Sequence, residues 1–66
     1  MFCLSMNGKN LVNADNLRVK KVSENNQYKY IIIANKDIEV ARYDTLKDAK
    51  YNLKMASIST DDRYEF

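Results

Sequence analysis

Histidine, proline and tryptophan are absent from this 66-residue sequence, and cysteine and glycine occur once each. Without histidine the chain has no imidazole base for a Ser/His/Asp or Cys/His set, and it cannot form a Cys/His zinc site. Its single glycine, Gly8, cannot build a glycine-rich phosphate loop. Cys3 has no partner for an intrachain disulfide, and a lone cysteine of this kind is typical of a reducing compartment. These absences argue against an enzyme.

Carboxylates do not supply an alternative active site. The adjacent pair Asp61-Asp62 lies near the C-terminus, and a calcium or magnesium site needs several further oxygen ligands. Asp44 and Asp48 flank the start of a predicted helix, where capping and the helix dipole account for them. We therefore expect a protein without catalytic residues, cofactor or metal.

Composition sets further limits. A net charge of +2, from 11 basic and 9 acidic residues, does not by itself indicate nucleic acid, and 45% apolar residues exclude a disordered chain. The apolar opening, residues 1–6, has no charged segment before it and is too short for a signal peptide or a membrane span. We expect a cytoplasmic protein with no membrane partner, or one in the host cytoplasm if a phage encodes it.

The short chain makes self-association a serious hypothesis. A domain of this size buries only about 60% of the surface that its unfolded chain exposes. Burial and conformational entropy then nearly cancel, and small domains usually need a disulfide, a metal or oligomerisation. With the first two excluded, a homodimer is the remaining means of stabilisation.

Turn signals divide the first two-thirds of the chain into strands. Asn7-Gly8 predicts a two-residue hairpin loop that places Leu4 opposite Leu11 and Cys3 opposite Val12. A second two-residue loop at Asn25-Asn26 sets Val19 opposite Ile32 and Leu17 opposite Ala34. A three-residue loop at 35–37 would then place Ile38 opposite Ala34 and Val40 opposite Ile32.

A helix follows the strands. Thr45 is a good N-cap with Asp48 three residues later, and one apolar face repeats at helical spacing. The residues of that face are Leu46, Ala49, Leu53 and Ala56, and the outer side carries Lys47, Lys50 and Lys54. The helix should end near Ser57. Residues 59–66 show no periodicity and are expected to form a flexible tail.

The predicted fold class is therefore α+β. An antiparallel β-meander of about four strands carries one C-terminal helix on one face, with residues 1–58 as a single domain. One face of this sheet is predicted to lie under the helix. By strand parity its residues are Leu17, Val19, Tyr28, Tyr30, Ile32, Ala34, Ile38 and Val40.

The other face of this sheet is the predicted partner-binding surface. It has an apolar centre, a basic edge and Glu39 at its border, which is how a docking surface with a polar rim looks. The predicted binding residues are Arg18, Lys20, Val22, Lys29, Ile31, Ile33, Ala41 and Tyr43. Three occupants remain open: the chain's own hairpin or tail, a second copy, or a different protein.

The leading functional hypothesis is a small non-catalytic binding protein, homodimeric through this face. The alternative is a nucleic-acid-binding accessory factor that uses Arg18, Lys20 and Lys29 near Tyr43. Against it, parity turns Tyr28 and Tyr30 toward the core, whereas base-stacking platforms need exposed aromatics. The lysines on the helix fit an ordinary soluble surface.

The strand-to-helix junction carries a resemblance to a known type of protein. Tyr43, Thr45, Asp48 and Ala49 follow a run of short strands, and this pattern resembles small accessory proteins of phages and prophages of low-GC Gram-positive bacteria. Abundant Asn, Lys and Ile, which have AT-rich codons, agree with that origin. The resemblance implies a protein that binds and modulates a host protein, such as a defence factor.

Overall fold

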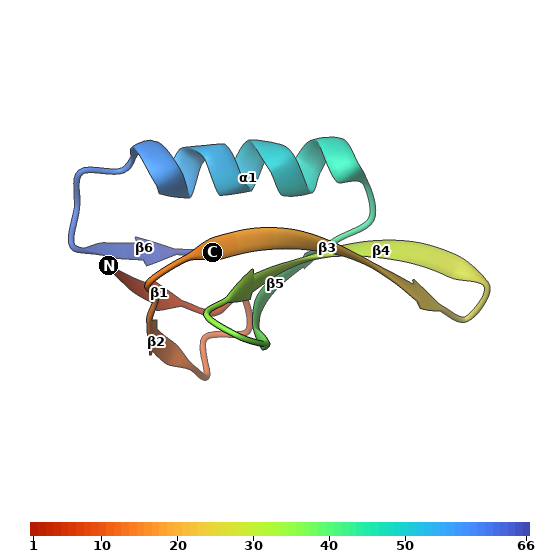
Figure 1. Ribbon diagram of the computed structural model, residues 1–66, viewed down its shortest axis with the longest axis horizontal. Helices are drawn as coiled ribbons and strands as arrows, with labels where there is room; N and C mark the ends of the chain where they lie inside the picture. Colours follow the sequence, from red (N-terminus) through yellow and green to blue (C-terminus); the bar gives the residue numbers. More distant parts are fainter.

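The computed structural model describes all residues from 1 to 66 and contains six strands and one helix in two sheets. Sheet A has the strand order β2-β1-β6, sheet B has the order β3-β4-β5, and α1 lies over sheet B (Figure 1). The α+β class is as predicted, but there are six strands and not about four. The elements are β1 Phe2–Leu4, β2 Leu11–Asn13, β3 Leu17–Glu24, β4 Gln27–Ala34, β5 Ile38–Tyr43, α1 Leu46–Ile58 and β6 Arg63–Glu65.

The β3–β4 hairpin forms as predicted. Asn25 and Asn26 have φ of 52° and 61°, the left-handed conformation that both central residues of a type I′ turn require. Val19 pairs with Ile32, which confirms the register. The tip of this hairpin extends beyond the start of α1 (Figure 1).

A β-bulge in β5 overturns part of the predicted parity. Ile38 pairs with Ala34 as expected, but the register then shifts, so that Glu39 pairs with Ile33 and Ala41 with Ile32. The prediction that Val40 lies opposite Ile32 was wrong, because Val40 is the extra residue. After the bulge, each side chain of β5 lies on the sheet face opposite to the one predicted.

The bulge moves two predicted binding residues. Ala41 lies opposite Ile32, and Tyr43 lies opposite Tyr30. Because directly opposed residues share a face, both belong to the side covered by α1, and their assignment to the partner-binding face was wrong. Arg42 takes their place on that face, opposite Ile31.

The N-terminal hairpin has the predicted register but a longer loop. Cys3 pairs with Val12, and Ser5 N donates to Asn10 O at 2.8 Å, which leaves residues 6–9 as the loop. Only Gly8 of the Asn-Gly pair has a positive φ, 74°, so the two-residue turn does not form. Instead the Asn7 side-chain oxygen accepts from the Ser5 hydroxyl at 2.6 Å and from Lys9 N at 2.9 Å. These side-chain bonds stabilise the wider loop.

The end of the chain forms a strand where a flexible tail was predicted. β6 pairs in parallel with β1, and the backbone bonds Phe2 N to Asp62 O, 2.8 Å, and Phe66 N to Leu4 O, 3.1 Å, hold its two ends. The Tyr64 and Phe66 rings meet edge to face with centroids 4.9 Å apart. Phe66 packs against the hydrophobic core. Burial of these two aromatics stabilises a strand too short to be recognised locally.

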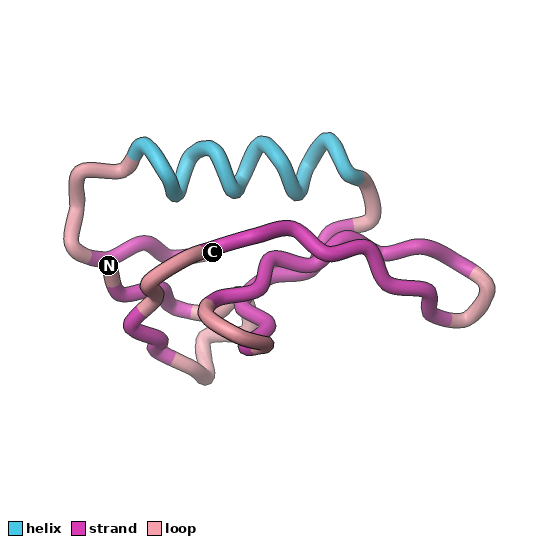
Figure 2. The backbone as a smooth tube through the Cα atoms, in the orientation of Figure 1, coloured by secondary structure: helices cyan, strands magenta, loops and turns pink.

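Asn35 joins the two sheets. Its backbone is left-handed, with φ of 59°, and its side-chain amide reaches across to the segment after β2. The amide nitrogen donates to Asn13 O at 3.2 Å, and the amide oxygen accepts from Asp15 N at 2.8 Å. A second link runs from Met6 N to Val40 O, 2.7 Å, at the bulge. Asn35 and Met6, which make these links, both lie in loops, and loops are drawn pink in Figure 2.

The core lies between the sheets and α1. Thr45 Oγ1 accepts from Asp48 N at 3.1 Å, which confirms the predicted N-cap. Ala49 and Ala56 are fully buried, so the predicted inner face of the helix is correct. The central buried cluster is Ile32, Ala34, Val40 and Ala41, against which Val12, Ala14, Leu17, Val19, Tyr43, Leu53 and Phe66 pack.

Candidate functional site

The apolar centre of the predicted docking face is closed within a single chain. Ile31 is 7% exposed and Ile33 is 3% exposed. Ile31 lies between Lys20 and Arg42, and Ile33 lies between Arg18 and Glu39. Long charged side chains of this kind lay their methylene groups over apolar neighbours. The expectation that these isoleucines offer a docking surface was wrong, and a dimer through this face loses its physical basis.

Ion pairs cover the same face. The Arg42 guanidinium contacts Glu24 and also bonds Glu39, with Nη2 3.0 Å from Oε1. Hydrogen bonds that the guanidinium donates to Glu39 and then to Glu24 raise the pKa of Arg42 further above its usual range. One arginine is thus held between two carboxylates on the sheet face that carries the isoleucines.

The predicted basic edge is largely occupied as well. Lys29 forms an ion pair with Asp44, and this hydrogen bond lowers the pKa of the Asp44 carboxyl. The Arg18 guanidinium donates to the backbone oxygens of Asn35 and Lys36. Val22, opposite Lys29, is half-buried. Of the three cations proposed for nucleic acid, only Lys20 has none of these contacts.

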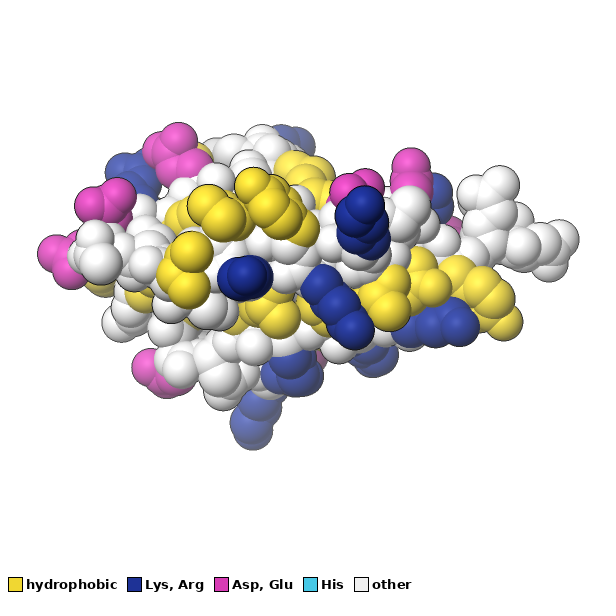
Figure 3. All heavy atoms as spheres, turned by 90° about the horizontal axis from the view of Figure 1, so that it is seen from above, with side chains coloured by type: hydrophobic (Ala, Val, Ile, Leu, Met, Phe, Trp, Pro, Cys, Tyr) yellow, Lys and Arg dark blue, Asp and Glu magenta, His cyan; other side chains and the backbone are white.

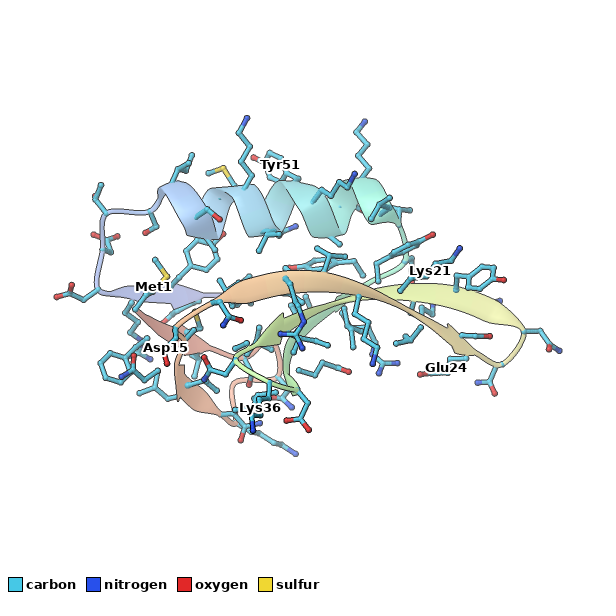
Figure 4. All side chains as sticks on the ribbon, viewed as in Figure 1. Met1, Asp15, Lys21, Glu24, Lys36 and Tyr51 are labelled. Atoms are coloured by element: carbon cyan, nitrogen blue, oxygen red, sulfur yellow. The ribbon has the colours of Figure 1, made fainter.

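Tyr28 is exposed on the opposite side of sheet B. Parity placed it in the core, but α1 does not reach the projecting end of the β3–β4 hairpin, and the tyrosine remains 59% exposed. Lys21 lies over its ring, with Nζ 3.9 Å from the centroid. Figure 4 shows Lys21 at this projecting end, beyond the first turn of α1. An exposed aromatic and a cation therefore occur together here.

The outer face of α1 carries a second exposed tyrosine. Tyr51 is 61% exposed and points away from the sheets (Figure 4). Lys47 precedes it by four residues and Lys54 follows it by three, so all three share a helix face, and Lys50 borders them. Asp48 is the only acidic residue within α1. This face is strongly biased toward positive charge.

These residues form a basic track on the helix side of the molecule. None of its four lysines takes part in an ion pair, and Phe2, Tyr28 and Tyr51 are the only aromatics with exposed side chains. Figure 3 shows basic side chains interspersed with apolar ones along this side. We define the basic track as Lys21, Tyr28, Lys47, Lys50, Tyr51 and Lys54. Sequence reasoning recognised only its three helical lysines.

An apolar band runs beside the lysines on α1. Met55 is 37% exposed and Ile58 is 60% exposed, and together with Tyr51 they fall at i, i+4 and i+7. This spacing places the three side chains in one stripe along the helix. The apolar band thus leaves hydrophobic surface uncovered on the side of α1 opposite its buried alanines.

Two other features carry less chemistry. A hollow of about 220 Å³ is lined by residues 5–7 and 39–42, but its charged side chains, Glu39 and Arg42, already pair with each other. Cys3 is fully buried, and desolvation raises the pKa of its thiol. A raised pKa reduces the thiolate fraction, so Cys3 is not an activated nucleophile.

Comparisons with known proteins add no relative. No family model matches the chain, and neither the curated proteins nor the solved structures yielded a similar sequence or fold. No helix in the structure combines the length and apolarity that crossing a membrane requires. The interpretation of the site therefore depends on its own geometry and charge.

Proposed function

We propose that this chain is a small, non-catalytic nucleic-acid-binding accessory protein that uses the basic track. The observation that carries the proposal is that Tyr28 and Tyr51 stand among four lysines that form no ion pair. Proteins that bind nucleic acid without strict sequence preference combine a basic surface for the backbone with aromatics for the bases. The basic track contains both components.

The shape of the molecule suits an elongated ligand. Its principal extents are 37 × 21 × 19 Å, and the basic track follows α1 and the projecting end of sheet B. A modest net charge is no obstacle, because only one of the nine acidic residues, Asp48, lies on α1, and the others lie elsewhere, where some of them pair with Lys29 and Arg42. Local potential, rather than total charge, steers a charged ligand to its site.

This proposal keeps the sequence alternative but moves its site. The original residues lay on the far face of sheet B, where Arg18 and Lys29 are occupied. The objection that Tyr28 faces the core no longer applies, since that residue is 59% exposed. The same hypothesis is therefore better supported on the helix side.

Salt dependence provides the first test. We expect a fluorescent oligothymidylate of about twelve nucleotides to bind in fluorescence anisotropy at about 50 mM NaCl. Each phosphate contact with a single strand contributes a slope of about −0.7 in log K against log salt, so four contacts predict an affinity about 50-fold lower at about 200 mM NaCl. Absence of binding at the lower salt would reject the proposal.

The apolar band supports a second candidate function, contact with another protein. Tyr51, Met55 and Ile58 have the i, i+4, i+7 spacing of a helix that docks into a hydrophobic groove. This candidate retains the hypothesis of an accessory protein that modulates a host protein, including a defence factor of a bacterium. It moves the contact surface from sheet B to α1.

A second copy of the chain is a poor occupant of the apolar band. Lys47, Lys50 and Lys54 lie along one side of the band at helical spacing. A two-fold axis between antiparallel helices would bring both lysine rows to the same side of the interface. Like charges at such close range disfavour association. A different protein with a complementary acidic rim fits this surface better.

Capture experiments test the protein-partner candidate. The wild-type chain should retain a specific protein from a low-GC Gram-positive lysate, and Ile58→Ser with Met55→Ser should abolish that retention because it removes two anchors. Leu11→Ser is the matched control, since Leu11 is 55% exposed on sheet A. Equal retention by all three chains would contradict this candidate.

A further inference from the structure

We infer that the nucleic acid is single-stranded and that its bases stack on Tyr28 and Tyr51; this inference rests on the proposed function. The two side chains are 59% and 61% exposed, and each has lysine beside it. Both rings are therefore accessible to a ligand. Stacking uses the ring face, and every base offers one whatever its identity.

Tyr28 has the arrangement that stacking needs. Lys21 lies 3.9 Å from its ring centroid, so one face of the ring already holds a cation. The ring belongs to β4, where Tyr28 pairs with Ser23 of β3, and the ladder of the hairpin therefore holds its backbone extended. A rigid platform loses little conformational freedom when a base binds. The lysine is then positioned to meet a phosphate next to the stacked base.

Tyr51 provides the second platform on a different element. It lies on α1, whose backbone is fixed by the packing of Ala49 and Ala56 against the sheets. Lys47 and Lys54 share its helix face, so phosphates on either side of a stacked base meet a cation. Two platforms on one side of the molecule allow one strand to contact both.

A duplex does not fit this arrangement. Its phosphates could meet the lysines, but its bases are paired and stacked on one another, so neither tyrosine could reach a free base face without unstacking the helix. The lysines alone do not discriminate the two forms. The tyrosines are the feature that selects single strands, which makes base stacking the property to test.

Three ligands of about twelve nucleotides separate stacking from charge: oligothymidylate, an abasic strand of equal length and a duplex, each at about 50 mM NaCl. The abasic strand keeps every phosphate and lacks only the bases. We expect oligothymidylate to bind at least about tenfold more tightly than the abasic strand and more tightly than the duplex. This comparison needs no variant and is independent of folding effects.

Tyrosine variants locate the stacking. Tyr28→Leu and Tyr51→Leu should each reduce affinity for oligothymidylate roughly 5- to 100-fold and leave affinity for the abasic strand unchanged. Phe2→Leu is the matched control, because Phe2 is 46% exposed but lies on sheet A, away from the basic track. It should bind all three ligands like the wild type.

The outcomes distinguish the inference from the proposed function. Equal binding of the oligothymidylate and abasic strands, tighter binding of the duplex, or full affinity in both tyrosine variants overturns the single-strand inference and leaves nucleic-acid binding in place. A loss in Phe2→Leu as large as that in the tyrosine variants also overturns it. Failure of all three ligands to bind rejects the proposed function itself.

Discussion

Replacing Lys21, Lys50 and Lys54 together with glutamate is expected to lower the affinity for oligothymidylate about 100-fold or more at about 50 mM NaCl. Each change removes one cation that meets a phosphate and adds a repulsive charge at the same place. The slope of log K against log salt should also flatten by about 0.7 for each lysine replaced. Fluorescence anisotropy across a salt series measures both quantities.

A control with the same change in net charge is available elsewhere on the chain. Lys9, Lys20 and Lys36 are exposed and form no ion pairs, and Figure 4 places Lys36 on the side of the sheets opposite α1. Their triple replacement with glutamate should change the affinity by less than about threefold. A comparable decrease in both triple variants would mean that binding follows total charge and not the basic track.

Ile32→Ala is expected to be the most destabilising single substitution, since Ile32 is fully buried at the centre of the core. Truncation of a buried isoleucine costs about 2–5 kcal/mol, because it removes apolar contacts and leaves a cavity. For a domain of this size each kcal/mol shifts the melting temperature by about 4–8 °C. We therefore expect a fall of at least about 10 °C in thermal unfolding followed by circular dichroism.

Ile38→Ala is the matched control for the core. It makes the same chemical change in β5, but Ile38 is 39% exposed, and the neighbouring structure and solvent can fill the space. The cost should be below about 1.5 kcal/mol. If the two variants unfold at the same temperature, the core is not centred on Ile32.

Local rules predicted the registers of the β1–β2 and β3–β4 hairpins and the helix. Asn25 and Asn26 tolerate the left-handed backbone of a two-residue turn, and once that turn is fixed the pairing of β3 with β4 follows residue by residue. Thr45 and the spacing of Ala49 and Ala56 fix the start and the buried face of α1 in the same way. Such features depend on residues that are close in the sequence, so the sequence alone is enough to predict them.

The bulge could not be predicted from the residues around it. Val40 and Ala41 are both apolar and adjacent, so the strand buries an apolar side chain in either register. In the structure a hydrogen bond from Met6 N to Val40 O joins the bulge to the N-terminal loop. That loop lies more than thirty residues away, and no local pattern encodes the contact.

The site was missed for a related reason. Strand parity correctly placed Tyr28 on the helix side of sheet B. Whether a side chain on that side is buried depends on how far α1 extends along the sheet. A helix of 13 residues is about 20 Å long and leaves the end of sheet B open. Conversely, Ile31 and Ile33 are buried on the face away from α1, between charged neighbours on the adjacent strands. How completely a sheet face is closed depends on tertiary packing, which strand parity does not specify.

The parallel pairing of β1 with β6 has a consequence for synthesis of the chain. Sheet B and α1 join segments close in sequence and can form as they leave the ribosome, whereas β1 must wait for the partner at residues 63–65. Until then one edge of Phe2–Leu4 stays unpaired, and the aromatic ring of Phe66 is missing from the core. The newborn chain therefore completes sheet A only after residues 63–65 have emerged.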